Sequence, residues 1–454
     1  MAVVIDLGEI TEQAPVDGPT LVQVRQRLLA SAAAVLILWA LVGSVPAVPR
    51  IGEPLWSAQA LPLGFLLGAD TAYVVDPGGR LISGHDPVTG GLRWKVALDA
   101  LAQEVVEAAP GIVAVQLGPQ FGVIPTDQLG DLTVVLIGPS GRTIARVPGQ
   151  LYGVFPGGQL LMLQPLAGCQ EGDCSQLAVV DPATGLTAWS LPSESHGFFP
   201  AQSCQPHTFA VFDGESVQIR ALATGDLVTR LRVLDTDSGL LQGGVLYDDE
   251  LVTAEIVHNG LILTGTPLAP SAQAWTVTLP QGVTPNGVSG GLFYAGCGGL
   301  ITAQLANATA VIDRHTGAIR ATIPGDLFVV PEIGAAAVTD GLSDGTGILL
   351  ALKGPSATAT QNVVLVFDAA NGTRLAFYPG SAIQLWDGAG GRALLSYEAG
   401  ERTHFTALDA RGRAHPLGAV DGTNLDCRAR ADLLACYADD KSVRVWRLPP
   451  YALP

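Results

Sequence analysis

The residues of this sequence that could carry out a reaction lie in a serine loop, in acidic loops and among six cysteines. Ser289 stands in the stretch 287–291, which matches the Gly-x-Ser-x-Gly pattern of hydrolase nucleophiles. That pattern needs a strand before the serine and a helix after it. Here the turn-forming residues 284–287 precede it and the apolar run 292–295 follows. We therefore interpret Ser289 as part of a loop, and we predict no catalytic residue.

The acidic loops match metal sites only in part. Residues 235–239 begin like a calcium loop, but they lack its third oxygen ligand and its distal glutamate. Residues 247–250 and 340–344 are acidic in the same way. His85 and His315 stand beside predicted turns, and no spacing places two histidines on one face. We interpret all of these as solvated turns and predict no metal ligand.

The cysteines are better suited to structure than to redox chemistry. All six lie beyond residue 168, and none shows the paired spacing of a zinc site or a Cys-x-x-Cys motif. An even number, in a chain that begins with a membrane signal, suggests disulfides in an oxidising compartment. One pair flanks a polar loop tip, one lies on neighbouring predicted strands, and the third follows by elimination. The predicted pairs are Cys169–Cys174, Cys427–Cys436 and Cys204–Cys297.

The composition indicates the elements that must position these residues. The chain has 454 residues, with 55 glycines and 31 prolines spread between short apolar runs. From Gly52 onward no stretch has the period of a long amphipathic helix, so we predict an all-β fold of many short strands. The net charge of −17 argues against binding nucleic acid through bulk charge. Arginine far outnumbers lysine, which we interpret as the coding bias of a bacterial, GC-rich source.

The N-terminal part of the chain is different in kind. Residues 1–27 are polar and acidic, and we predict a disordered cytoplasmic tail. Residues 28–49 are free of charge and long enough for a transmembrane helix, which needs about 20 apolar residues. Two arginines before the run and one after it place the N-terminus inside. We therefore predict a single-pass protein of the cytoplasmic membrane, with residues 50–454 as its extracytoplasmic ectodomain. A cleaved signal peptide is the alternative, with residues 45–47 as its cleavage site.

A short unit recurs along the ectodomain. A strand ends in Asp-x-x-Thr-Gly, and a second strand carries tryptophan four residues after the glycine. Seven turn glycines are separated by 51, 44, 40, 92, 55 and 40 residues, and Ser271 with Trp275 falls midway in the long gap. The structural residues of the best copies are Asp86, Gly90, Trp94, Asp181, Gly185, Trp189, Asp313, Gly317, Asp368 and Gly372.

Each part of this unit has a physical role. Aspartate and threonine side chains bond to turn backbone groups, and glycine adopts the positive φ of a tight turn. The tryptophan buries a large face between neighbouring sheets. A period of 40–50 residues with about four strands per unit is typical of a β-propeller.

The unit resembles the repeat of pyrroloquinoline-quinone-type (PQQ-like) β-propellers, and residues 84–94 and 179–189 match it best. Other copies lose the tryptophan and carry Ala321, Ala376 or Pro416 in its place. In the dehydrogenases of that family the cofactor rests between a tryptophan and a disulfide of two adjacent cysteines. This chain has no adjacent cysteines, so the resemblance implies a non-catalytic, membrane-anchored member without a cofactor.

The two ends of the ectodomain are expected to share one blade. The stretch 52–56 has the same glycine-to-tryptophan spacing but has no strands before it, and the runs 432–437 and 442–448 supply strands that lack partners. Such closure removes exposed sheet edges. We predict an eight-bladed propeller, with seven or nine blades as alternatives.

No reaction is encoded in these patterns, so we expect a scaffold that binds a protein or another envelope component. The acidic charge favours a basic or polar partner. One alternative is an enzyme or carbohydrate-binding module that uses the central funnel. A second is a PQQ-dependent dehydrogenase.

Overall fold

The computed structural model describes most of residues 50–454 and none of the chain before them. It describes residues 50–449 except 63, 120–130, 156–157, 167–174, 193–198, 201, 204–206, 213–215, 233–239, 248, 258–259, 270–271, 281–292, 296–299, 305–307, 325–327, 330–347, 354–362, 369–370, 372, 388–392 and 410. Within these ranges no helix has the length and apolarity that crossing a membrane requires. The predicted tail (1–27) and transmembrane helix (28–49) lie outside them.

The described elements are all strands, and they form four-stranded antiparallel units that we number in chain order. Unit 1 comprises β2 (Phe65–Leu67), β3 (Ala72–Val75), β4 (Leu81–His85) and β5 (Leu92–Ala97). Unit 2 comprises β6 (Leu101–Ala109), β7 (Ile112–Gly118), β8 (Thr133–Ile137) and β9 (Thr143–Pro148). Unit 3 comprises β10 (Gln150–Val154), β11 (Leu160–Pro165), β12 (Ser175–Val180) and β13 (Thr187–Pro192).

Units 4 to 6 follow the same order. Unit 4 comprises β14 (Phe199–Pro200), β16 (Thr208–Phe212), β17 (Ser216–Ala221) and β18 (Leu227–Arg232). Unit 5 comprises β19 (Leu240–Leu246), β20 (Glu250–Val257), β21 (Gly260–Pro267) and β22 (Trp275–Pro280), with β15 (Gln202–Ser203) added beside β19. Unit 6 comprises β23 (Phe293–Ala295), β24 (Leu300–Gln304), β25 (Ala308–Asp313) and β26 (Ile319–Pro324).

The last three units complete the series. They comprise β27 (Phe328–Val329), β28 (Ile348–Lys353), β29 (Val363–Asp368) and β30 (Arg374–Pro379); β31 (Ser381–Asp387), β32 (Ala393–Ala399), β33 (Arg402–Leu408) and β34 (Ala414–Asp421); and β35 (Asp426–Arg430), β36 (Leu433–Tyr437) and β37 (Ser442–Arg447) with β1 (Trp56–Gln59). A parallel pair, β31 with β35, joins units 8 and 9 into one eight-stranded sheet. The described strands therefore make nine units, and they do not confirm the predicted eight.

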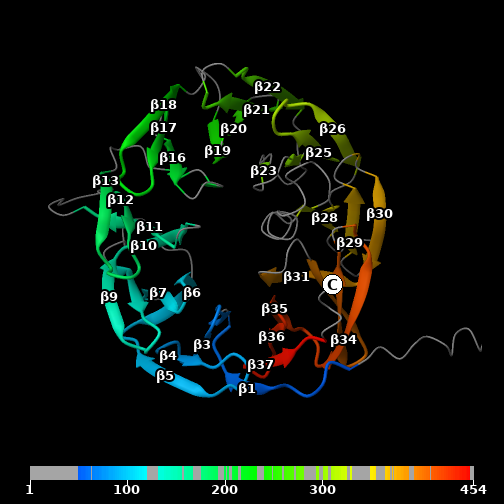
Figure 1. The fold of residues 1–454 in the computed structure, drawn as a ribbon. Helices are drawn as coiled ribbons and strands as arrows, with labels where there is room; N and C mark the ends of the chain where they lie inside the picture. Colours follow the sequence, from blue (N-terminus) through cyan, green and yellow to red (C-terminus); the bar gives the residue numbers. More distant parts are fainter. Residues whose placement is uncertain are drawn as a thin grey trace, which may run out of the picture. The chain divides into compact units, whose positions relative to one another are not determined.

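The first strand pairs with the last one. Trp56 lies opposite Val445 in the antiparallel pair of β1 and β37, which lie side by side in Figure 1. Just before this strand the Ile51 amide donates to the Ala419 carbonyl at 3.0 Å, and the Ile51 side chain is buried. The predicted sharing of one unit by both ends is confirmed.

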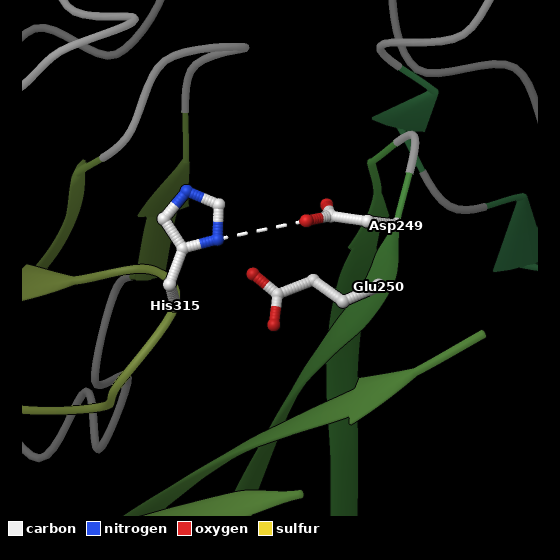
Figure 2. Close-up of side chains that lie close together, drawn as sticks. All are labelled: Asp249, Glu250 and His315. Carbon is white, nitrogen blue, oxygen red and sulfur yellow. Dashed lines mark ion pairs between the residues drawn. The ribbon is translucent and has the colours of Figure 1, made fainter. Parts of the chain in front are cut away.

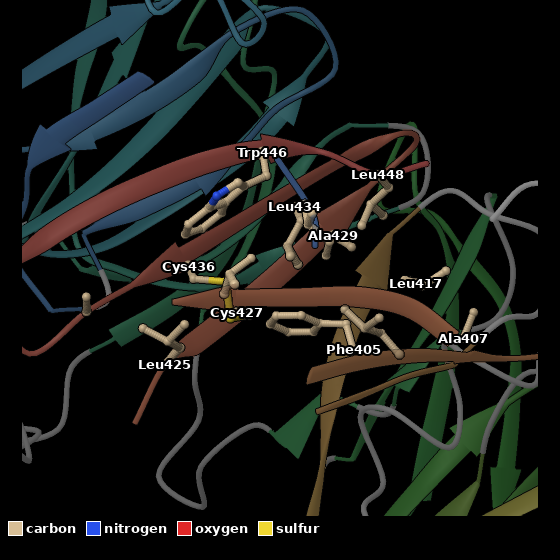
Figure 3. Close-up of a cluster of buried hydrophobic side chains, with 14 residues drawn as sticks. Phe405, Ala407, Leu417, Leu425, Cys427, Ala429, Leu434, Cys436, Trp446 and Leu448 are labelled. Carbon is tan, nitrogen blue, oxygen red and sulfur yellow. A yellow bond between two sulfur atoms is a disulfide. The ribbon is translucent and has the colours of Figure 1, made fainter. Parts of the chain in front are cut away.

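Successive units pack face to face. Each buried cluster draws apolar residues from two neighbours: Val75 of unit 1 with Val113 of unit 2, or Phe405 of unit 8 with Trp446 of unit 9 (Figure 3). Another cluster joins Val445 of unit 9 to Val74 of unit 1. Such contacts join unit 8 to unit 9, unit 9 to unit 1, and then each unit to the next as far as unit 6. The sheets therefore follow one another around a ring (Figure 1). This is the architecture of a β-propeller.

The predicted turns dock one unit onto the next. Gly317 has a φ of 68°, and a Cβ atom there would lie 2.4 Å from the Trp275 ring of the preceding unit. The same relation holds between Gly225 and Trp189. The turn aspartate accepts backbone N–H bonds, as Asp313 Oδ1 does from the amides of His315 and Thr316 at 3.0 Å. Aspartate, glycine and tryptophan therefore act together at unit junctions.

The structure joins Cys427 to Cys436, the pair expected on neighbouring strands. They face each other across β35 and β36, with Cα atoms 4.0 Å apart. Both side chains are buried in the cluster between units 8 and 9 (Figure 3). The other four predicted cysteines, and Gly372 of the repeat, lie outside the described residues.

Candidate functional site

A cluster of charged side chains lies at the junction of units 5 and 6. Asp249 and Glu250 come from the hairpin between β19 and β20, and Arg314 and His315 come from the tip of the turn between β25 and β26. Figure 2 shows Asp249, Glu250 and His315 facing one another across this junction. We call these four residues, with Tyr247 and Trp275, the 5–6 cluster.

Local structure places each of the four. The turn of unit 6 closes through the Gly317 amide, which donates to the Asp313 carbonyl at 2.9 Å, and Asp313 also pairs with Arg320. Arg314 and His315 follow this anchored aspartate directly. Opposite them, the Tyr247 amide donates to the Glu250 carbonyl at 2.8 Å and closes the hairpin. Two regular tight turns therefore bring two carboxylates towards a guanidinium and an imidazole.

Arg314 is the centre of the 5–6 cluster. Its Nη2 lies 3.3 Å from Asp249 Oδ1, and its Nε lies 3.4 Å from Glu250 Oε1. The guanidinium also lies over the ring of Tyr247, 4.3 Å from the ring centroid, where a cation–π attraction holds it. His315 Nδ1 lies 3.6 Å from Asp249 Oδ2. One cation thus faces two carboxylates and an aromatic ring.

Glu250 is the most unusual member. Its side chain is 7% exposed, compared with 57% for Asp249. Trp275 Nε1 donates to its Oε2 at 3.3 Å, whereas Oε1 is buried and accepts no hydrogen bond. Burial raises the pKa of the Glu250 carboxyl to about 7, although the nearby Arg314 opposes this rise. Glu250 therefore titrates near neutrality.

Three members of the 5–6 cluster have side chains of the kinds that bind metal ions. Asp249, Glu250 and His315 each offer one ligand atom, and these atoms lie within 4.8 Å of one another. The Arg314 guanidinium, however, already stands within 3.4 Å of both carboxylates. At such distances two like unit charges repel by about 4 kcal/mol at an effective dielectric constant of about 20, and a divalent ion would be repelled more. We assign the cluster as an ion-pair network and none of its members as a metal ligand.

The prediction of a solvated turn at 247–250 is wrong for Glu250. Strand β20 buries every second residue against unit 6. Glu250 lies on the same face of the strand as Val252 and Ala254, which are both in that core. The alternation of side chains along a strand could have shown this, had the start of the strand been known. His315 is half exposed, as expected beside a turn, yet it also approaches Asp249.

Several predicted features cannot be placed. The serine loop at 287–291 and the acidic loops at 235–239 and 340–344 lie outside the described residues, as does Asp248. Of the repeat residues, Asp368 is described and its carboxylate accepts a bond from Asn371 Nδ2 at 3.1 Å. Of the residues weighed as metal candidates in the sequence, the structure brings together Asp249 and Glu250 of the loop 247–250 with His315.

Comparison with known proteins finds no matching protein-family profile and no matching curated protein. Among solved structures the chain is similar to BamB from Moraxella catarrhalis, at 13% identity and a TM-score of 0.41 over 87% of this chain and 99% of that one. It is similar to the dihydro-heme d1 dehydrogenase NirN in complex with DHE, at 15% identity and a TM-score of 0.44 over 84% and 83%. It is also similar to apo AztD from Citrobacter koseri, at 9% identity and a TM-score of 0.39 over 76% and 92%. At these values no functional inference rests on the likenesses.

Proposed function

We propose that the chain is a membrane-tethered binding module. Residues 28–49 would hold it in the cytoplasmic membrane as a single-pass anchor, and the ring would present its turns on the extracytoplasmic side to a protein or another envelope component. We also infer nine blades, one for each four-stranded unit, with the last one shared between the two ends of the chain.

The observation that supports this proposal most is the closure of the ring by β1 and β37. Because the first and last strands of the ring pair with each other, the ring needs no strand from another molecule. Its turns are then free to recognise a partner on a rigid support. Arg50 and Ile51, which directly follow the apolar run in the sequence, already contact Ala419 of the ring.

Two further features agree with an extracytoplasmic ring. The Cys427–Cys436 disulfide is of the kind that persists in oxidising compartments. The chain's net charge of −17 would favour a basic or polar contact surface on the partner. An enzyme or carbohydrate-binding site in the central funnel stays a prediction.

Topology can be tested with the full chain carrying an epitope at its C-terminus. We expect the epitope in the membrane fraction after a high-salt wash, and we expect added protease to remove it from intact spheroplasts. An epitope that is protected in spheroplasts, or that is released by salt, would contradict the membrane-tethered arrangement.

Binding can be tested by photo-crosslinking from single turn positions in the living cell. Leu186, Val88 and Ile319 are exposed at equivalent turns of units 3, 1 and 6, at 68%, 38% and 49%. A module with a defined binding face should give one discrete adduct from some of these positions and none from others. Equal labelling from all three positions, or labelling from none of them, would count against the proposed binding face.

A further inference from the structure

The tryptophans that dock one unit onto the next do not all use the same hydrogen-bond acceptor. Trp56 Nε1 donates to the carbonyl of Pro87 at 3.0 Å, and Trp189 Nε1 donates to the carbonyl of Leu222 at 2.6 Å. Both acceptors are main-chain groups three residues before the turn glycine of the next unit. Trp275 packs on Gly317 in the same way, yet its Nε1 donates to the Glu250 carboxylate of its own unit.

The Trp275 junction thus has an ionisable acceptor, whereas the Trp56 and Trp189 junctions have acceptors that cannot change their charge. Glu250 Oε2 receives the Trp275 bond at 3.3 Å, and Oε1 faces Arg314 Nε at 3.4 Å without a hydrogen bond. A buried carboxylate held by two such contacts keeps much of its desolvation cost. The neutral acid has a much smaller cost, because only the charged form is strongly penalised by burial.

Among the described residues, the charged and titratable groups around Glu250 belong to the two turns and the strand next to them. The hairpin of unit 5 contributes Tyr247 and Asp249. The turn of unit 6 contributes Asp313, Arg314 and His315, and β26 contributes Arg320, which pairs with Asp313. Arg314 favours the charged form of Glu250, whereas Asp249 and Asp313 oppose it.

We propose that the junction between units 5 and 6 is a pH-sensitive joint, closed when Glu250 is protonated and weakened when Glu250 is ionised. Separating Asp249 and Glu250 from the turn 313–317 would return the Glu250 carboxylate to water. The ionised form gains more from this than the neutral form does. The raised pKa of the carboxyl, about 7, sets the change near neutrality. The proposal does not depend on the module's partner or location.

The sign follows from linkage. An exposed glutamate has a pKa of about 4.5, and the buried one has a pKa of about 7. Between these values the closed joint binds more protons than the open one, so closure weakens as the pH rises. From pH 6 to pH 8 the two values predict that the equilibrium constant for opening rises about tenfold.

Hydrogen–deuterium exchange of the full chain in detergent tests this. The amides of Tyr247 and Gly317 are bonded within the two turns, and their protection is compared at pH 6, 7 and 8 after correction for intrinsic exchange. We expect protection of the peptides that carry them to fall about tenfold. The matched control is the turn of unit 4, where the Gly225 amide donates to Ala221 and Trp189 uses a carbonyl. Its corrected protection should not change.

Two variants assign the response. Glu250→Gln keeps the shape and an acceptor for Trp275 but cannot ionise, so its protection should be flat across this pH range. His315→Gln should retain the wild-type response. The proposal is overturned if the wild-type joint shows no fall in protection relative to the unit 4 turn, which requires no variant. It is also overturned if Glu250→Gln retains the fall or if His315→Gln abolishes it.

Discussion

Arg430 Nη1 lies 2.8 Å from Glu107 Oε2, and this ion pair crosses the point where the ring closes. Arg430 ends β35 of unit 9 and also donates to the Leu67 carbonyl of unit 1 at 2.9 Å. Glu107 belongs to β6 of unit 2 and accepts the Ala69 amide of unit 1 at 2.9 Å. One carboxylate therefore connects unit 9, at the end of the chain, with units 1 and 2 at the start of the ring.

Replacing Glu107 with alanine should lower the free energy of unfolding by about 3 kcal/mol. The Glu107 side chain is 11% exposed, and its removal takes away the carboxylate that faces the half-buried Arg430 guanidinium and the acceptor of the Ala69 amide. The matched control is Asp99→Ala, which breaks the exposed Arg146 pair and should cost less than about 1 kcal/mol. Denaturant unfolding of both variants checks this, and equal losses would contradict it.

Replacing Gly317 with alanine should destabilise the ring more than replacing Gly400 does. Both glycines have positive φ, 68° and 65°, so both changes carry the backbone cost of about 1 kcal/mol. Only at Gly317 would the new Cβ meet a ring, that of Trp275, whereas nothing lies within 4 Å at Gly400. Thermal unfolding of the two variants measures the difference. A similar loss in both would show that Trp275 does not dock there in solution.

The Cys427–Cys436 disulfide should resist reduction until unit 9 unfolds. Both cysteines are buried, with exposed fractions of 1% and 0%. The bridge closes a loop with a sequence separation of 9 residues, and its loss should lower the free energy of unfolding by about 2 to 3 kcal/mol. Pulsed alkylation in reductant, read out on the peptide containing Cys436, tests the protection. Rapid labelling of the native chain would refute it.

Replacing Asp86 with asparagine should remove a pH-dependent part of the stability. The Thr89 amide and Arg93 hold the pKa of the Asp86 carboxyl down at about 2. A depressed pKa contributes stability above the ordinary value near 3.8, and this contribution is lost as the pH falls through about 2. Wild type and Asp86→Asn should therefore differ at pH 5 and converge towards pH 2 in unfolding measurements. A difference in unfolding free energy between the two proteins that stayed constant with pH would rule out ionisation of Asp86 as its cause.

The sequence by itself determined the features that depend on neighbouring residues in the chain. Gly90 and Gly185 were identified because a tight turn demands a positive φ, and Trp94 and Trp189 because their distance from those glycines is fixed along one strand. The pairing of Trp56 with the last strand also followed, since the strands at the two ends lacked partners. Such local rules apply where the turn glycine and the tryptophan are both present, as in units 1 and 3.

Tertiary structure decided what depends on which surfaces meet. The number of four-stranded units was not fixed by turn glycines, because some turns are degenerate and strands alone show where one sheet ends. The approach of Glu250 to Arg314 was invisible in the sequence, because the two lie on different units and only the ring brings those turns together. Local geometry is encoded within a few residues, whereas the environment of a charge is set by groups far along the chain.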